Sequence, residues 1–182
     1  MHELVPRVND LNYISTLKEL CIKYEIGLLI PLIDTELNIL ASNKKEFEES
    51  GVEVLISSPA VNEICFDKRN TYSFFRDIGV DTPEILNPDV ILGESNSNYP
   101  FLIKPSNGSC SVGVTKKLIT NGNYVFFKDY IPNAILQEFI TGEEYTLDVL
   151  VDFEGNVRSI VPRLRLETRA GEVSKGLTVK KL

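Results

Sequence analysis

The feature that decides the fold is the stretch FLIKPSNGSCSVG at residues 101–113. An apolar run typical of a buried strand ends in Lys104, and a loop of small residues follows from Ser106 to Gly113. A lysine in this position passes its stem through the core, so its ammonium group needs an anionic partner such as a phosphate. Backbone N–H groups of a small-residue loop can approach phosphate closely. The stretch predicts a phosphate site between two strands, although it lacks the Walker signature and many ordinary hairpins are equally rich in glycine and serine.

The residues after this loop follow strand patterns. Gly142 and the run Glu154–Asn156 supply turn chemistry between successive segments. Because short turns join antiparallel neighbours, we expect a mainly antiparallel sheet in the second part of the chain. The predicted strands cover residues 101–104, 112–118, 134–140, 144–152 and 157–167.

The first part of the chain reads differently, because helical patterns alternate with short apolar runs. Asn9 or Asp10 is predicted to cap the first helix, and Asp34 or Thr35 the second. Helices between strands imply parallel strands with right-handed crossovers, as in a doubly wound, Rossmann-like sheet. Since the chain starts at a helix, we expect this unit to be partial. The predicted elements are a helix from residue 11 to 24, a strand over 28–33, a helix that ends before Gly51 and a strand over 52–56.

Two further helix starts are marked by their capping residues. Ser58 followed by Pro59 gives the signal for a short helix, and Asp67 gives it for a helix over Lys68–Ile78. Beyond these helices the pattern changes to strands, so the chain combines an α/β part with an α+β part.

Composition limits what the chain can be. Its 182 residues are 43% apolar and 25% charged, so it can bury a core and is neither disordered nor fibrous. No apolar run approaches the roughly 20 residues that span a bilayer, and the first residues do not resemble a signal peptide. We therefore expect a cytoplasmic protein without a membrane partner. The net charge of −7 also disfavours nucleic acid as a partner.

Cysteine and histidine give no sign of a metal site or a nucleophilic triad. Cys21, Cys65 and Cys110 lie far apart without metal-ligand spacing, so we expect three buried small apolar side chains. The single histidine, His2, lies at a chain end. The chemistry therefore has to rely on lysine, arginine, acidic side chains and backbone groups.

Basic residues gather toward the end of the sequence. Residues 157–182 hold seven basic and two acidic residues. Arg163, Arg165 and Arg169 stand among apolar residues in a strand-like pattern, and guanidinium groups match the geometry of carboxylate and phosphate. The segment predicts a site for one of these anions, with an exposed basic strand as an equally good interpretation.

A second motif, ILQEFITGEEYTLDV at residues 135–149, completes a set with the lysine strand and its loop. Together they resemble the ATP-grasp superfamily, in which these elements occur in this order. The resemblance implies that the strand lysine contacts ATP phosphate, that the loop covers the phosphates, and that the later motif lines adenine and ribose. The residues implied to contact ATP are Lys68, Lys104, Ser106, Gly108, Ser109, Ser111, Gly113, Glu138, Phe139, Ile140 and Glu144.

The resemblance also implies a role for each residue. Lys68 and Lys104 would neutralise phosphate charge, Glu138 would lie beside the adenine amino group, and Glu144 would accept hydrogen bonds from ribose hydroxyls. Phe139 and Ile140 would supply the backbone hinge at the adenine edge. Taken singly, each acidic residue is better explained as a solvated strand end, and Lys68 as a solvent-facing helix residue; the ordered combination of motifs favours ATP binding.

Three further stretches, residues 29–32, 73–83 and 161–165, resemble the carbamoyl phosphate synthase large-chain group and its carboxylate-amine ligase relatives. The resemblance implies a partial pre-ATP-grasp domain over residues 1–66 and a C-terminally incomplete ATP-grasp domain over 67–182. It also implies a reaction in which ATP phosphorylates a carboxylate or bicarbonate, and an amine then displaces phosphate from the acyl phosphate.

Such a reaction needs no side-chain nucleophile, because orientation and charge stabilisation carry the catalysis. The resemblance implies Mg²⁺ on the phosphates, with Arg163, Arg165 and Arg169 toward the substrate or the acyl phosphate. The family binds Mg²⁺ through a late Glu and a Glu-x-Asn pair, which this sequence lacks. The ligands are therefore expected beyond Leu182, and this chain by itself is not expected to turn over.

Two functions remain open at this point. The first is the ATP-binding portion of a ligase whose other partners are a small carboxylate and an amine, with a homo-oligomer as one possible state. The second is a non-catalytic nucleotide-binding or partner-binding module of the same fold.

Overall fold

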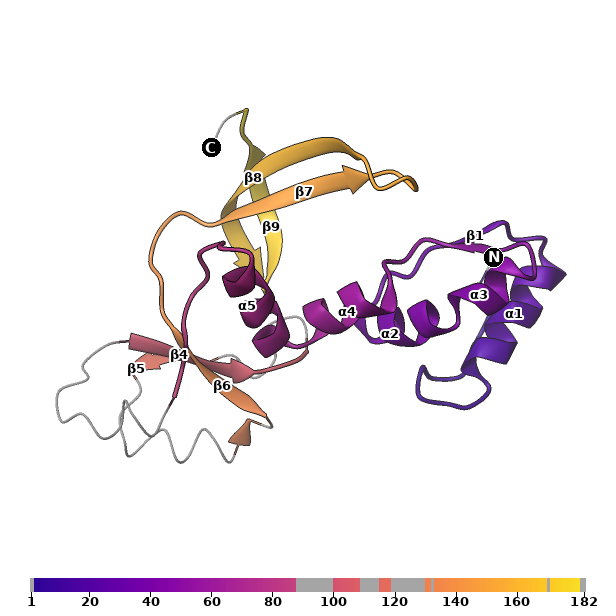
Figure 1. Ribbon diagram of the computed structural model, residues 1–182, viewed down its shortest axis with the longest axis horizontal. Coiled ribbons are helices and arrows are strands. Elements are labelled where there is room, and N and C mark those ends of the chain that lie inside the picture. The colour runs from indigo at the N-terminus through magenta and orange to yellow at the C-terminus, as the bar shows by residue number, and fades with distance from the viewer. Residues whose placement is uncertain are drawn as a thin grey trace. The chain divides into compact units, whose positions relative to one another are not determined.

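The computed structural model describes residues 2–87, 100–108, 115–118, 130–131, 133–169 and 171–180. The chain divides into two compact units, Met1–Thr82 and Pro83–Leu182. The first unit contains α1 (Tyr13–Lys23), β1 (Leu28–Leu29), α2 (Asp34–Ser42), α3 (Lys44–Glu48), β2 (Glu53–Val54), α4 (Pro59–Phe66) and α5 (Lys68–Asp77) (Figure 1). The second contains β3 (Ile85–Leu86), β4 (Pro100–Pro105), β5 (Thr115–Leu118), β6 (Ala134–Glu138), β7 (Tyr145–Val151), β8 (Val157–Arg169) and β9 (Glu172–Thr178).

The two strands of the first unit run parallel, as the alternation of helices and strands predicts. Leu28 lies opposite Glu53, and Leu29 lies opposite Val54. Both strands are shorter than predicted, with two residues each. Pro31 has no N–H group to donate to a ladder, which limits the length of β1. The predicted parallel pairing of these two strands is confirmed.

The core of the first unit is centred on α3. Phe47 is 0% exposed there, and its buried neighbours are Leu40, Val54, Cys21 and Val52. Apolar side chains from α1, α2 and β1 pack against this cluster. One aromatic ring thus joins the helices to the parallel strand pair.

The helix starts agree with the predicted caps in two of the four cases. Ser58 and Asp67 accept hydrogen bonds from first-turn N–H groups of α4 and α5, at 3.4 and 2.8 Å. The first helix is different, because its N-cap is Asn12 and the prediction of Asn9 or Asp10 is wrong. Asp10 instead accepts a hydrogen bond from the Asn12 N–H at 2.8 Å, which closes a turn before the helix begins.

The second predicted helix is two helices in the structure. Neither Asp34 nor Thr35 caps α2, because the N-cap is Ile33 in an extended conformation. Both predicted caps therefore lie in the first turn, where Asp34 still interacts favourably with the helix dipole. The break between α2 and α3 falls at Asn43, whose side-chain amide donates to the Ile39 carbonyl at 2.7 Å. Asparagine competes in this way for backbone groups that a continuous helix would use.

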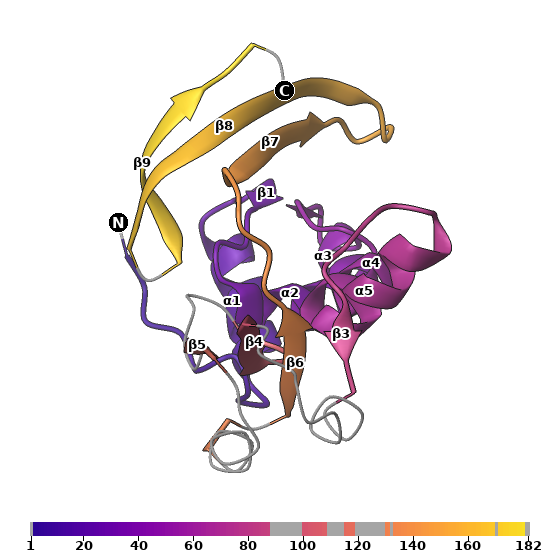
Figure 2. The same cartoon turned by 90° about the vertical axis from the view of Figure 1, so that its left-hand side faces the viewer.

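The first sheet of the second unit has the strand order β3-β6-β4-β5, with every neighbouring pair antiparallel. Figure 2 shows β6 between β3 and β4. Phe101, Ile103 and Leu136 share one face of this sheet and are buried with Ile131. The predicted antiparallel sheet is confirmed, and β3 is an addition that the sequence did not reveal.

The second sheet is a meander of β7, β8 and β9 with β8 in the centre. The predicted turn between β7 and β8 is present, and the Asp152 carboxylate accepts a hydrogen bond from the Asn156 N–H at 2.7 Å. The strand β9 was not predicted. It follows Gly171, whose φ of 83° lies in the left-handed region that glycine adopts without strain.

The two faces of this second sheet differ in chemistry. Leu147, Val149, Ile160 and Leu177 share one face by register and are 50–58% exposed. We call these four residues the apolar face. The opposite face carries Glu144, Thr146, Asp148, Arg163 and Arg165, and we call these five residues the polar face.

The cysteines agree only in part with the prediction that all three are buried. Cys21 is buried, and burial raises the pKa of its thiol. Cys65 is exposed, so the prediction is wrong there, while Cys110 lies outside the described residues. None of the helices in the described part of the chain combines the length and the apolar character that a membrane span requires.

Candidate functional site

Lys104 lies near the end of β4, directly before the predicted phosphate loop. It stands opposite Ile135 of β6, on the sheet face that also carries Leu102 and Gln137. Lys104 is half-buried, whereas Ile135 and Gln137 are buried. The aliphatic stem of a lysine suits such a face, and a partly desolvated ammonium group requires an acceptor or an anion beside it.

The loop after Lys104 begins in the described part of the chain. Ser106 is 1% exposed, and its N–H donates to the Asn133 carbonyl at 3.0 Å. Gly108 has a φ of 101°, which favours glycine. Strands β4 and β5 pair on both sides of the loop, so its predicted place between two strands is confirmed. The predicted loop residues that lie outside the described residues are Ser109, Ser111 and Gly113.

Glu138 ends β6 and is tied to the segment before β3. Its N–H donates to the Glu84 carbonyl at 2.9 Å, and its carboxylate accepts from the Glu84 N–H at 3.3 Å. The buried side chain of Gln137 adds a bond to the Pro83 carbonyl at 3.3 Å. Phe139, half-buried, and Ile140, exposed, follow directly. The end of the strand is therefore held in place where the resemblance expects adenine.

The strand register sets the spacing between the predicted phosphate and adenine ends. Lys104 lies opposite Ile135, and Glu138 lies opposite Phe101. The two site residues are thus offset by about 10 Å along the sheet, at ~3.3 Å per residue. Because side chains alternate along a strand, the side chains of Lys104 and Glu138 lie on opposite faces of the sheet, and it is the backbone at the end of β6 that can share a ligand with Lys104.

Glu144 and Arg165 meet on the polar face. The Arg165 guanidinium donates to the Glu144 carboxylate at 2.5 Å, and the Arg165 N–H donates to the Glu144 carbonyl at 2.8 Å. A second guanidinium nitrogen donates to the Gly171 carbonyl at 2.5 Å. The family resemblance assigned Glu144 to the ribose of ATP and Arg165 to the acid or the acyl phosphate. In the structure these two residues form one ion pair.

The other two predicted arginines also pair with carboxylates. Arg163 makes a two-pronged contact with Asp148, at 3.0 Å for each bond. Arg169 is 81% exposed and lies 3.4 Å from Glu167. Glu167 also receives a hydrogen bond from Lys175 at 2.5 Å, and this bond holds the pKa of its carboxyl below the ordinary value. Of the three arginines, Arg169 has the most accessible guanidinium.

A pocket of about 260 Å³ opens beside these pairs on the second sheet. Cations and one acid line it together, so it suits a small molecule that carries charges of both signs. The lining residues are Thr146, Arg163, Arg165, Gly171, Glu172 and Val173.

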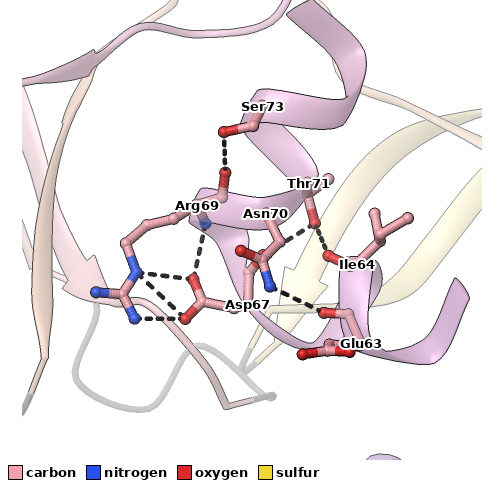
Figure 3. A network of polar contacts seen from close by, with 7 residues as sticks. All are labelled: Glu63, Ile64, Asp67, Arg69, Asn70, Thr71 and Ser73. Carbon is pink, nitrogen blue, oxygen red and sulfur yellow. Dashed lines mark hydrogen bonds and ion pairs between the residues drawn. The ribbon is translucent and has the colours of Figure 1, made fainter. Parts of the chain in front are cut away.

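Lys68 belongs to the first unit, as the first residue of α5. It is half-buried, and burial lowers the pKa of its ammonium group while the neighbouring Asp67 carboxylate opposes this shift. Figure 3 shows the polar contacts that fix this helix start: Asp67 binds the Arg69 side chain, and Thr71 donates to the Ile64 carbonyl at 2.7 Å. The backbone at Lys68 is therefore held on both sides.

Replacement of Asp67 by alanine is expected to lower the free energy of unfolding by about 1 kcal/mol, since α5 loses its capping acceptor. Asp67→Asn keeps an acceptor for the Arg69 N–H and should retain most of the stability. Urea unfolding followed by circular dichroism measures both. Equal losses in the two variants would contradict the capping role and point to the exposed Asp67–Arg69 ion pair.

The family resemblance implies a bound Mg²⁺ ion, but the described part of the chain contains no cluster of side chains that could hold it. No group of three or more histidine, cysteine, aspartate or glutamate side chains converges there. Mg²⁺ prefers several oxygen ligands in octahedral geometry. The described residues do not fit the ion.

Sequence reasoning missed Asp148 and Thr146, which complete the polar face beside the arginines. The signal was present, because Glu144, Thr146 and Asp148 alternate with a period of two and so share a face of β7. Their partners could not be assigned, since these depend on the register between β7 and β8.

Two family models match the chain. The PylC-like, N-terminal domain matches residues 1–55, and the ATP-grasp domain matches residues 65–181, more than half of the chain. The predicted domain boundary between residues 66 and 67 stays a prediction.

Relatives of known activity share modest identity with this chain. A carbamoyl-phosphate synthase of Methanobrevibacter smithii is 26% identical over 170 residues, which cover 91% of this chain and 44% of the relative. A D-alanine–D-alanine ligase of Marinomonas sp. is 28% identical over 138 residues, which cover 66% of this chain and 43% of the relative. The chain therefore spans less than half the length of these relatives.

The crystal structure of an L-amino acid ligase from Bacillus licheniformis has a similar fold. Its TM-score is 0.69 at 16% identity, and the match covers 98% of this chain and 43% of the ligase. The resemblance that the lysine strand, its loop and the later motif carry is thus confirmed, and the chain belongs to the ATP-grasp family.

Proposed function

We propose that this chain is the ATP-binding portion of a ligase that activates a carboxylate, or bicarbonate, as an acyl phosphate for attack by an amine. The observation that carries the proposal is the placement of Lys104 and Glu138 on paired strands, with the small-residue loop directly after the lysine. Members of the ATP-grasp family bind ATP, generally with Mg²⁺. The relatives above supply the reaction class, since each is named as a ligase or synthase.

Each of the predicted site residues then has a specific proposed role in ATP binding. Lys104 neutralises phosphate charge, and the family resemblance suggests the same role for Lys68. The loop that starts at Ser106 offers backbone N–H groups to the phosphates, and Gly108 allows the chain to turn there. Glu138 and the backbone that follows it lie along adenine, and Glu144 accepts hydrogen bonds from the ribose hydroxyls.

The acid and the amine are proposed to bind near the pocket on the second sheet. Arg163 lines it, and Arg169 has an accessible guanidinium in the same sheet. Glu172, an acid in the lining, is suited to an ammonium group. Together they support a small substrate with a carboxylate and an amine. A homo-oligomer stays a prediction.

One observation favours the second candidate, a non-catalytic nucleotide-binding module. Arg163 and Arg165 already pair with Asp148 and Glu144, so their charge is largely neutralised before any substrate arrives. Binding without phosphoryl transfer needs no free cation at this point. The two candidates differ in whether ATP is consumed.

The first experiment measures ATP binding by thermal unfolding and calorimetry, with and without Mg²⁺. At a nucleotide concentration about 100 times the Kd, stabilisation of about 2.7 kcal/mol is expected. An unchanged Tm at millimolar ATP would contradict both candidates. Release of ADP with a panel of carboxylates and amines, in the longest form that the gene encodes, then separates the ligase from the binding module.

A further inference from the structure

Arg165 is mostly buried, whereas the carboxylate that it contacts is exposed. Its side chain is 17% exposed, against 64% for Glu144. One Glu144 oxygen accepts from Arg165, and the other oxygen has no hydrogen bond within the described chain. A carboxylate offers about four lone-pair sites. Glu144 can therefore accept further hydrogen bonds while it stays bound to Arg165.

The surroundings of Arg165 leave Glu144 as its counter-ion. Its Nε is buried and has no hydrogen-bond partner among the residues that the structure describes. A buried guanidinium without a carboxylate is strongly unfavourable, so the pair is stable as a unit. An exposed glutamate would otherwise sample many rotamers. The arginine thus restricts Glu144 to one place on the polar face.

The same guanidinium reaches a second structural element. One nitrogen binds the Glu144 carboxylate, and another binds the Gly171 carbonyl at the turn between β8 and β9. The backbone bond from Arg165 to the Glu144 carbonyl keeps the start of β7 in register with β8. Arg163, two residues earlier, contacts Asp148 and has no such link to the turn within the described chain. The planar fork of Arg165 is suited to this double contact, because it presents donors on two separate nitrogens in a fixed geometry.

We propose that Arg165 is a positioning residue that holds Glu144 for the ribose hydroxyls of the nucleotide and ties it to the β8–β9 turn. This inference rests on the proposed function, because it takes Glu144 as the ribose acceptor. It differs from the sequence prediction that Arg165 faces the acid or the acyl phosphate. A fixed acceptor binds more tightly, because the side chain is ordered before the ligand arrives.

The test compares ATP with 2′,3′-dideoxy-ATP, which lacks both ribose hydroxyls. Wild-type protein is expected to bind ATP about tenfold more tightly than the dideoxy analogue. Arg165→Gln should weaken ATP binding several-fold and leave the affinity for the analogue unchanged. The ratio of the two affinities should therefore fall toward one. Glu144→Gln should do the same, and the double variant should equal Glu144→Gln alone, since Arg165 acts through that carboxylate.

Arg158→Gln is the matched control, because Arg158 also lies on β8 and pairs across the hairpin with a carboxylate, Asp152, at 2.5 Å. It should leave the preference for ATP intact. Arg165→Lys, which keeps the charge but not the fork, should lose part of the preference and serves if the glutamine variant unfolds.

Other results would overturn the inference. If Arg165→Gln weakens the binding of both nucleotides equally, the arginine acts on the phosphates instead. If the ratio of the two affinities is unchanged, Arg165 has no role in positioning Glu144. If wild-type protein binds both nucleotides but prefers neither, this inference fails and the proposed ATP site stands. If it binds neither nucleotide, the proposed function itself fails.

Discussion

Exchange of Lys104 for methionine is expected to weaken ATP binding between about tenfold and a hundredfold, the factor for one lost hydrogen bond to a charged group. Methionine keeps an unbranched apolar side chain on the face that carries Ile135 and Gln137, so the sheet should stay intact. The charge that opposes the phosphates is lost. Calorimetry with ATP gives the affinity, and thermal unfolding without nucleotide shows whether the fold is preserved.

Lys45→Met is the control for this change, because Lys45 is an exposed lysine of α3. It should bind ATP as the wild type does. If the Lys104 variant keeps the wild-type affinity and the same ATP-induced rise in Tm, the lysine has no role in the site. A fall in affinity for both variants would indicate a nonspecific effect of charge.

Replacement of Phe47 by alanine is expected to destabilise the first unit by about 3–5 kcal/mol, the usual range for a fully buried phenylalanine. The ring is 0% exposed and packs among Leu40, Val52 and Val54, so its removal leaves a cavity as well as lost apolar burial. Since α1–α5 all lie in this unit, circular dichroism at 222 nm during urea unfolding follows mainly this part of the chain.

Phe66→Ala provides the comparison, because Phe66 is 45% exposed at the end of α4. The loss in free energy of unfolding should be clearly smaller for Phe66→Ala than for Phe47→Ala. Phe47→Leu fills part of the cavity and should fall between wild type and Phe47→Ala. Similar losses for Phe47→Ala and Phe66→Ala would show that the cluster around α3 does not limit the stability of the first unit.

The order of helices and strands could be predicted from local sequence signals. The helix boundaries were predicted correctly where a capping residue and the residue after it both mark the start. Ser58 before Pro59 and Asp67 before Lys68 define helix starts within a few residues, and both caps are confirmed. Asn43 shows the limit of such reasoning. Its neighbours favour a continuous helix, yet α2 ends before Asn43 and α3 begins after it, and the Asn43 side-chain amide donates to a carbonyl one turn earlier.

Long-range pairing explains what the sequence could not reveal. The two-residue strand β3 exists because it pairs with β6, and its own residues carry no strand pattern long enough to detect. The Lys104 strand, the loop after it and the later motif could be placed from their order alone. The pairs of Arg163 with Asp148 and Arg165 with Glu144 could not, because they depend on the register of β7 against β8.

The apolar face of β7, β8 and β9 has a consequence for handling the protein in solution. Leu147, Val149, Ile160 and Leu177 present adjacent apolar side chains to water. Contiguous apolar surface promotes self-association, and sulfate or phosphate salts strengthen this tendency because they are excluded from protein surfaces. Purification by salt precipitation and storage at high concentration will therefore favour aggregates, whereas dilute samples in chloride buffers suit the binding measurements.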